Sequence, residues 1–124
     1  SPLRPDILTH LDQKIYPLQM EEIVPAAAER GVALELNNTG LVLGKSDVVQ
    51  LRRMIELGAR HGALFTVNSD GHTWIEFGDD AAMRQFLRDT TAPALDILND
   101  RPLKDVLTHL AARRAQRLAA LPDA

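Results

Sequence analysis

Histidine, carboxylate and amide side chains follow three short apolar segments of this 124-residue chain. His10 follows the first segment, Asn37 follows the second, and Asp70 and His72 follow the third. Imidazole nitrogen and carboxylate oxygen together are suitable ligands for Zn²⁺, Mn²⁺ or Fe²⁺. Gly71 between Asp70 and His72 permits a tight backbone path. The pattern therefore predicts a metal site, provided that the fold brings the three segment ends together.

Each of these residues also has an ordinary structural interpretation. A histidine at a strand end is often only a hydrogen-bonded structural residue, and Ser69-Asp70-Gly71 is a common turn sequence. Asn37-Asn38 is typical of a turn that tolerates positive φ. Glu35 lies inside an apolar segment, where a carboxylate must be paired, hydrogen-bonded or facing solvent. The coincidence at three successive segments favours a shared site.

Strands and helices are expected to alternate along the chain. The apolar segments 7–9, 32–36 and 63–67 are predicted strands, and a brief apolar run covers 95–98. Helical spacing predicts helices over 19–30, 47–60, 79–89 and 103–121. This alternation with short connections indicates an α/β fold with a parallel sheet. Sites in such folds form at the C-terminal ends of strands, which is where the candidate side chains lie.

Local signals predict several details of these elements. Gly31 is expected to end the first helix, and Ser46 is expected to be the N-cap of the second. Residues 37–40 are predicted as a turn. Trp74, directly after the Asp-Gly-His sequence, is expected to be a buried loop anchor, with the wall of a substrate pocket as the alternative.

Composition argues against several classes of protein. The chain has 14 Lys and Arg against 17 Asp and Glu, a net charge of −3, which disfavours general nucleic-acid binding. Without cysteine, any metal must be held by histidine and carboxylate. The chain has neither an apolar run near the roughly 20 residues that span a bilayer nor a secretory leader, so we expect a cytoplasmic protein with no membrane partner.

The two ends of the chain carry weaker signals. The sequence begins Ser1-Pro2, from which we expect a processed or excised boundary. Residues 101–124 contain five basic residues against two acidic ones. Basic residues toward a helix C-terminus favour the helix dipole, so this segment is expected to be a solvated end, with contact to phosphate or nucleic acid as the alternative.

Four segments follow one another in a familiar order. They are Asp6-Ile7-Leu8-Thr9-His10, Ala33-Leu34-Glu35-Leu36-Asn37-Asn38, Asn68-Ser69-Asp70-Gly71-His72-Thr73, and the stretch 97–103. In this order they resemble the strand-plus-His motif, the ALEINN segment, the SDxHT motif and the closing segment of the PHP family, the polymerase and histidinol phosphatase domains. The resemblance covers nearly the whole chain.

The resemblance implies a distorted (β/α)7 barrel, of which residues 1–124 would be the C-terminal portion of a single domain, an α/β partial parallel barrel. It implies two or three divalent ions, Zn, Mn or Fe, and hydrolysis of a phosphate ester by metal-activated water. His10, Asp70 and His72 would be metal ligands. Glu35 and Asn37 match a family segment but no standard ligand position, and are expected to be supporting or substrate-side residues.

The chain also departs from the family. The family opens with an H-x-H motif, and this sequence contains none. We therefore expect the rest of the barrel to come from a missing N-terminal half, and little or no catalysis from the isolated chain. A homodimer that covers the exposed sheet edges is a further expectation.

Two other functions remain open from the sequence. One is a nuclease or non-catalytic PHP module attached to a DNA polymerase, acting as a structural or interaction domain, although nucleic acid is not the favoured partner. The other is a small α/β binding protein whose resemblance to the family is coincidental.

Overall fold

The computed structural model describes residues 5–90 and 94–122, so the boundary expected at Ser1-Pro2 lies outside the described residues. The described elements, in chain order, are β1 (Ile7–Leu8), α1 (Met20–Arg30), β2 (Ala33–Asn37), α2 (Asn38–Val42), α3 (Val48–His61), β3 (Leu64–Asn68), α4 (Ala81–Asp89), β4 (Asp96–Ile97), a 3-10 turn (Leu98–Asp100) and α5 (Leu103–Ala119). In this part of the chain no helix is both long and apolar enough to cross a membrane.

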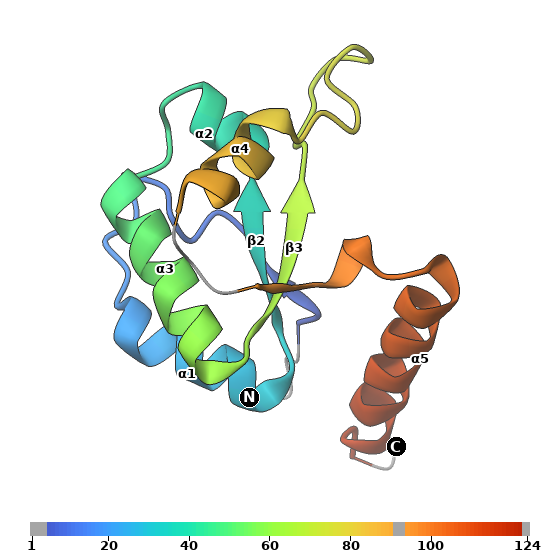
Figure 1. Ribbon diagram of the computed structural model, residues 1–124. Helices are drawn as coiled ribbons and strands as arrows, with labels where there is room; N and C mark the ends of the chain where they lie inside the picture. The colour runs from blue at the N-terminus through green and yellow to red at the C-terminus, as the bar shows by residue number, and fades with distance from the viewer. Residues whose placement is uncertain (1–4, 91–93, 123–124) are drawn as a thin grey trace.

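The strands form one parallel sheet in the order β1-β2-β3-β4. This confirms the predicted α/β class with a parallel sheet, and the arrangement fits a partial barrel-like unit. Helices α1 and α3 lie on one side of β2 and β3, and α5 lies on the other (Figure 1). The C-terminal ends of β2 and β3 point to one edge, where α2, α4 and the loop after β3 also lie (Figure 1).

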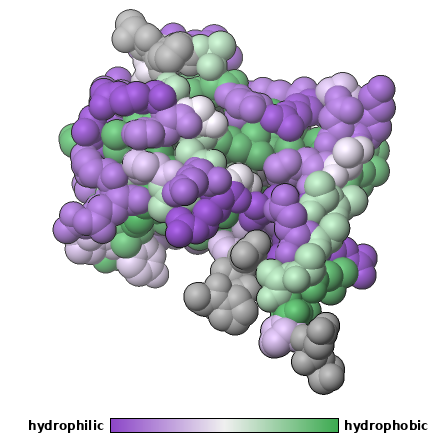
Figure 2. All heavy atoms as spheres, turned by 90° about the horizontal axis from the view of Figure 1, so that it is seen from below, coloured by the Kyte–Doolittle hydropathy of each residue, from purple (hydrophilic) through white to green (hydrophobic). Residues whose placement is uncertain are grey.

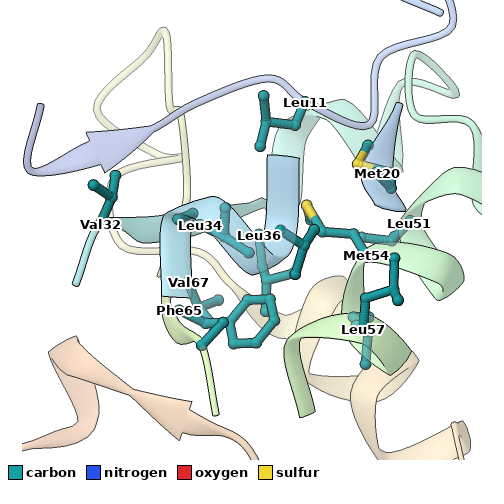
Figure 3. Packing of buried hydrophobic residues seen from close by; sticks show 14 of the residues in the cluster. Leu11, Met20, Val32, Leu34, Leu36, Leu51, Met54, Leu57, Phe65 and Val67 are labelled. Carbon is teal, nitrogen blue, oxygen red and sulfur yellow. The ribbon is translucent and has the colours of Figure 1, made fainter. Parts of the chain in front are cut away.

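The main core fills the space between the central strands and helices α1 and α3. Leu34 and Leu36 of β2 and Phe65 of β3 are fully buried there, together with Met54 of α3 (Figure 3). The Phe65 ring lies directly against Gly58 of α3, where an added Cβ would be 2.2 Å from the ring Cζ. The close approach of α3 to the sheet therefore requires glycine at this position.

Strand alternation turns polar side chains toward the opposite face of the sheet. Glu35 and Asn37 alternate with the core leucines of β2, and Thr66 and Asn68 occupy the corresponding register positions in β3. Glu35, Asn37 and Thr66 are nevertheless buried, and other protein groups satisfy their hydrogen bonds. Glu35 accepts from His10 N and from the Asn68 amide, Asn37 donates to Asp70, and Thr66 accepts from the Asn68 amide. This polar face carries the candidate site.

The structure confirms one of three local predictions about helix ends and turns and contradicts the other two. Gly31 ends α1 in the left-handed conformation, with φ of 62°, which confirms that prediction. Ser46 is not the N-cap of α3, because the side chain of Asp47 accepts the backbone N–H groups of Val49 and Gln50 instead. The predicted turn over 37–40 is wrong, because α2 begins there and is capped by Asn37.

Side chains also replace backbone pairing beyond β4. Asn99 follows this very short strand, and its amide accepts from Val67 N at 3.0 Å and donates to Val67 O at 2.6 Å. Arg84 of α4 donates to both carboxylate oxygens of Asp100 at 2.6 and 2.7 Å. The guanidinium holds the pKa of Asp100 below its ordinary value. These contacts attach the turn after β4 to the sheet and to α4.

The basic C-terminal helix is not simply a solvated end. Arg113 is buried, and its guanidinium donates to the carbonyl oxygens of Arg30 at 2.5 Å and Pro5 at 2.6 Å. Arg113 and Arg117 both pair with the carboxylate of Asp6. The expectation of a solvated segment is therefore wrong for Arg113, which fastens α5 to the start of β1 and the end of α1.

The apolar side chains of α5 have little to pack against among the described residues. Val106 contacts a small cluster on the second face of the sheet. Four leucines of α5 remain exposed, Leu103, Leu107, Leu110 and Leu118, as does Leu121 just after the helix. Seen from below, at the N-terminal ends of the central strands, the surface is mostly hydrophilic, with smaller apolar areas between the polar residues (Figure 2).

Candidate functional site

The site begins with two residues that adopt an unusual backbone conformation. His10 has φ of 59° and Asp70 has φ of 50°, and within residues 5–90 and 94–122 they are the two non-glycine residues with positive φ. Each follows the C-terminal end of a strand, His10 after β1 and Asp70 after β3. Such conformations cost on the order of 1–3 kcal/mol each and cluster at functional sites. The surrounding structure must hold both residues in place.

Asn37, at the end of the intervening strand β2, joins these two residues. Its Nδ2 donates to Asp70 Oδ2 at 3.0 Å and lies 3.4 Å from Nδ1 of His10. Its Oδ1 accepts from the backbone N–H of Gly40 at 2.7 Å, which caps α2. The Asn37 side chain is 2% exposed, so its position is set by these partners. The end of β2 therefore connects the ends of β1 and β3.

Glu35 of β2 contacts both the backbone and the ring of His10. Its Oε2 accepts the backbone N–H of His10 at 3.1 Å and lies 3.9 Å from Nδ1 of the ring, while its Oε1 accepts from Asn68 Nδ2 at 3.0 Å. Glu35 is 6% exposed in an interior strand, so it does not occupy a solvent-facing edge. The hydrogen bond to the His10 backbone is one of the contacts that stabilise the left-handed conformation there.

The His10 ring faces the protein through one nitrogen. Gln13 Nε2 lies 2.9 Å from Nδ1, on the same side as the Asn37 amide and the Glu35 carboxylate. The other nitrogen, Nε2, makes no hydrogen bond to the described residues, and the side chain is 41% exposed. A metal-binding histidine keeps its proton on the nitrogen that faces the protein, and the Glu35 carboxylate is the negatively charged group on that side of the His10 ring.

His72 lies farther along the loop that leaves β3. Its backbone N–H, like that of Thr73, donates to Glu76 Oε2, at 2.7 and 3.0 Å respectively. These two bonds lower the pKa of Glu76. The loop projects beyond the sheet edge, and Trp74 on it is 80% exposed. The expectation of Trp74 as a buried anchor is therefore wrong, because Glu76 closes the loop through backbone hydrogen bonds instead.

The donor atoms fit a divalent metal in type but form only part of a coordination sphere. Among the described residues no three His, Asp or Glu side chains are grouped closely enough to hold an ion. The structure joins His10 and Asp70 through Asn37, and places His72 at a hollow beside α2. Imidazole and carboxylate are the right chemistry for zinc, manganese or iron, and further ligands would have to complete the shell.

Asp12, two residues after His10, is a further buried carboxylate of this region, to which the sequence assigned no role. It is 1% exposed, and neither carboxylate oxygen has a hydrogen-bond partner among the described residues. Burial raises its pKa, while the nearby Ser46 hydroxyl, itself buried, acts to lower it. The only signal in the sequence is its position two residues after His10.

Comparison with known proteins points to phosphatases. The chain is 33% identical over 109 residues to a probable phosphatase of Shewanella halifaxensis, covering 87% of the chain and 43% of the relative. It is 30% identical over 119 residues to a probable phosphatase of Shewanella piezotolerans, covering 95% and 48%. A probable phosphatase of Pectobacterium carotovorum is 32% identical over 118 residues, covering 94% and 48%.

These relatives support a phosphatase-like function in general. No protein-family model matches the chain, and no solved structure matches it significantly. The chain spans about half the length of the relatives it matches.

Proposed function

We propose that this chain is the C-terminal half of a PHP-type barrel and supplies part of the metal site of a metal-dependent phosphoesterase. The observation that carries the proposal is the linked pair of left-handed residues, His10 and Asp70, held by one buried asparagine at the edge where three strands end. The relatives named probable phosphatases and the segment order support the same reaction class.

In this proposal the side chains of the protein bind and orient divalent ions, and none of them reacts directly with the phosphate ester. Divalent ions, when bound, would neutralise phosphate charge and lower the pKa of a water molecule. His10 offers Nε2 in the tautomer that carries its proton on Nδ1, on the side of the ring that faces the Glu35 carboxylate. Asp70 offers the oxygen that the Asn37 amide does not engage. His72 offers its ring from the loop, and Glu35 fixes the His10 backbone.

We further propose that the remaining ligands lie outside this chain. The described residues hold fewer than three grouped ligands, and the exposed leucines of α5 leave an apolar surface to be covered. An N-terminal half of the barrel would meet both needs at once. A second copy of the chain would cover the leucines and the sheet edges but would bring no new kind of ligand.

The direct test is a chimera in which this chain replaces the matching segment of the Shewanella halifaxensis relative. We expect the chimera to hydrolyse an aryl phosphate with Zn²⁺ or Mn²⁺, and the isolated chain to show little activity. Substitution His10→Ala or Asp70→Ala should lower kcat/KM by about 100-fold. His109→Ala on α5 is the matched control and should leave kcat/KM unchanged.

Two results would contradict the proposal. One is a chimera whose metal-dependent activity survives both His10→Ala and Asp70→Ala. The other is robust metal-dependent hydrolysis by the 124-residue chain alone, because a half barrel should not hold its ions well enough for catalysis.

A further inference from the structure

Helix α2 and the loop after β3 enclose a hollow whose lining includes His72, one of the proposed metal ligands. Its volume is about 270 Å³, and its lining includes Val42, Leu43 and Lys45 on one side and His72, Glu76 and Asp79 on the other. We refer to it as the α2–loop hollow. We propose that it receives the alcohol portion of the phosphate ester and selects an uncharged, apolar group of about the size of a phenyl ring. This inference rests on the proposed function.

The apolar side of the hollow is unusually open. Val42 is 61% exposed and Leu43 is 60% exposed, although each is an aliphatic side chain at the end of a helix that is otherwise packed in the fold. The backbone beneath them is held firmly: Leu43 N donates to Thr39 O at 2.9 Å, and Asn38 attaches α2 to α4 by accepting from Met83 N at 2.8 Å. The two side chains therefore form a fixed apolar surface that a ligand can cover without rearranging the fold.

The charged groups of the hollow leave little preference for a charged ligand. Glu76 is occupied by the backbone N–H groups of His72 and Thr73, and Asp79 Oδ1 accepts from Ala81 N at 3.1 Å. Lys45, whose backbone is fixed on both sides, forms no ion pair within the described ranges and balances part of this negative charge. A carboxylate ligand would be repelled by Glu76 and Asp79. The hydrogen bonds that these carboxylates already accept, and the nearby Lys45, weaken their attraction for an ammonium, so the apolar surface of Val42 and Leu43 favours a neutral apolar group.

His72 connects the hollow to the reaction. It lines the hollow and is also one of the three proposed metal ligands. In this inference a phosphate bound through the metal ligands would have the α2–loop hollow beside His72, and its alcohol group would occupy that hollow. The volume of the hollow is large enough for one aromatic ring or a short aliphatic chain.

The test compares two ligands that cannot be hydrolysed, phenylphosphonate and methylphosphonate, which differ only in the ring. Both are titrated with Zn²⁺ into the isotopically labelled chimera described above, which supplies the other half of the barrel, and amide and methyl NMR shifts are followed. We expect both ligands to shift the amides of His10 and Asp70, and only phenylphosphonate to shift the methyl groups of Val42 and Leu43. Phenylphosphonate should bind about tenfold more tightly, because its ring covers apolar surface.

A matched pair of variants isolates the hollow. Val42→Ser should remove about half of the tenfold preference on a logarithmic scale, so that roughly threefold remains, and leave methylphosphonate affinity unchanged. Val49→Ser, at a valine of α3 that is 76% exposed, should change neither affinity. Both positions are exposed, so both variants are expected to fold, which the NMR spectra would report directly.

The possible failures are distinguishable. Equal affinity for the two ligands, with shifts at His10 and Asp70 but none at Val42 and Leu43, would overturn the inference and leave the proposed function intact. Methyl shifts without any change at His10 and Asp70 would show a hollow unconnected to phosphate binding and would overturn it as well. No binding of either ligand would count against both, and the activity of the chimera would then decide the proposed function separately.

Discussion

Asn37 is the residue whose replacement tests the site geometry most sharply. Its oxygen caps α2 through Gly40 N, and its nitrogen binds the Asp70 carboxylate. Asn37→Ala removes both bonds, whereas Asn37→Asp keeps an oxygen for the cap and replaces the donor by a second carboxylate oxygen. The two variants therefore separate the cap from the link to Asp70.

The magnitudes follow from the contacts. Losing the cap costs about 1 kcal/mol, and losing a hydrogen bond to a charged group costs about 1.5–3 kcal/mol, so Asn37→Ala should lose about 2–4 kcal/mol of unfolding free energy. In Asn37→Asp two carboxylate oxygens would lie near the 3.0 Å that now separates Asn37 from Asp70. At that separation unit charges repel by about 5 kcal/mol at an effective dielectric constant of about 20.

The assay is urea unfolding in metal-free buffer from pH 4 to pH 8. At pH 8 we expect the wild type to be most stable, Asn37→Ala intermediate and Asn37→Asp least stable. Because repulsion raises the pKa of the carboxyl pair in the folded variant, its deficit should be smallest near pH 4 and grow as the pH rises through that pKa. An Asn37→Asp protein as stable as Asn37→Ala at pH 8, with no pH dependence beyond that of the wild type, would refute the proposed contact between Asn37 and Asp70.

Three further predictions concern the scaffold. Gly58→Ala should destabilise the fold by about 1–3 kcal/mol because its Cβ would overlap the Phe65 ring, and the loss should be smaller in a Phe65→Leu background, as measured by a double-mutant cycle of urea unfolding. Arg113→Met should cost about 2–4 kcal/mol by removing the charged hydrogen bonds of the buried guanidinium to the Pro5 and Arg30 carbonyl groups, whereas exposed Arg114→Met should be neutral; equal thermal shifts would contradict this. The pKa of Asp100 is lowered in the folded protein, so its contribution to the unfolding free energy is present at neutral pH and is lost as the pH falls through the folded pKa. Asp100→Asn should therefore be about 0.5–1 kcal/mol less stable than the wild type at pH 7, and it should lose less stability than the wild type in an acid titration.

The elements themselves were predictable because hydrophobic periodicity determines them. The strands at 32–36 and 63–67 and the helices at 47–60 and 79–89 agree with the structure to within about two residues. Their alternation leads to a parallel sheet through right-handed crossovers, which are nearly obligatory. Parallel strands end at one edge, so the approach of His10 and Asp70 to Asn37 follows from topology rather than from any motif.

Contacts made by single polar side chains over long sequence distances were not predictable. Arg113 lies on a helix where the basic residues Lys104 and Arg114 are exposed, and nothing in its sequence neighbours indicates that it reaches the carbonyl groups of Pro5 and Arg30. Asn99 substitutes for strand pairing with Val67 in a segment too short to show strand periodicity. Both interactions depend on three-dimensional proximity, which local pattern does not encode.

The left-handed backbone conformations of His10 and Asp70 also depend on contacts that local sequence pattern does not encode. The sequence alone therefore could not decide between a functional site and ordinary turns at these residues. Glycine is the usual signal for positive φ, yet glycine follows Asp70 rather than occupying its position, and none is near His10. The conformation is maintained by the Glu35 carboxylate on the His10 backbone and by the Asn37 amide on Asp70. Contacts from β2 hold His10 and Asp70 in a backbone conformation that lowers the stability of the fold. Such a cost is expected where the conformation serves a function. The strained residues that follow β1 and β3 therefore favour a binding site formed by His10 and Asp70 over turns that only connect elements.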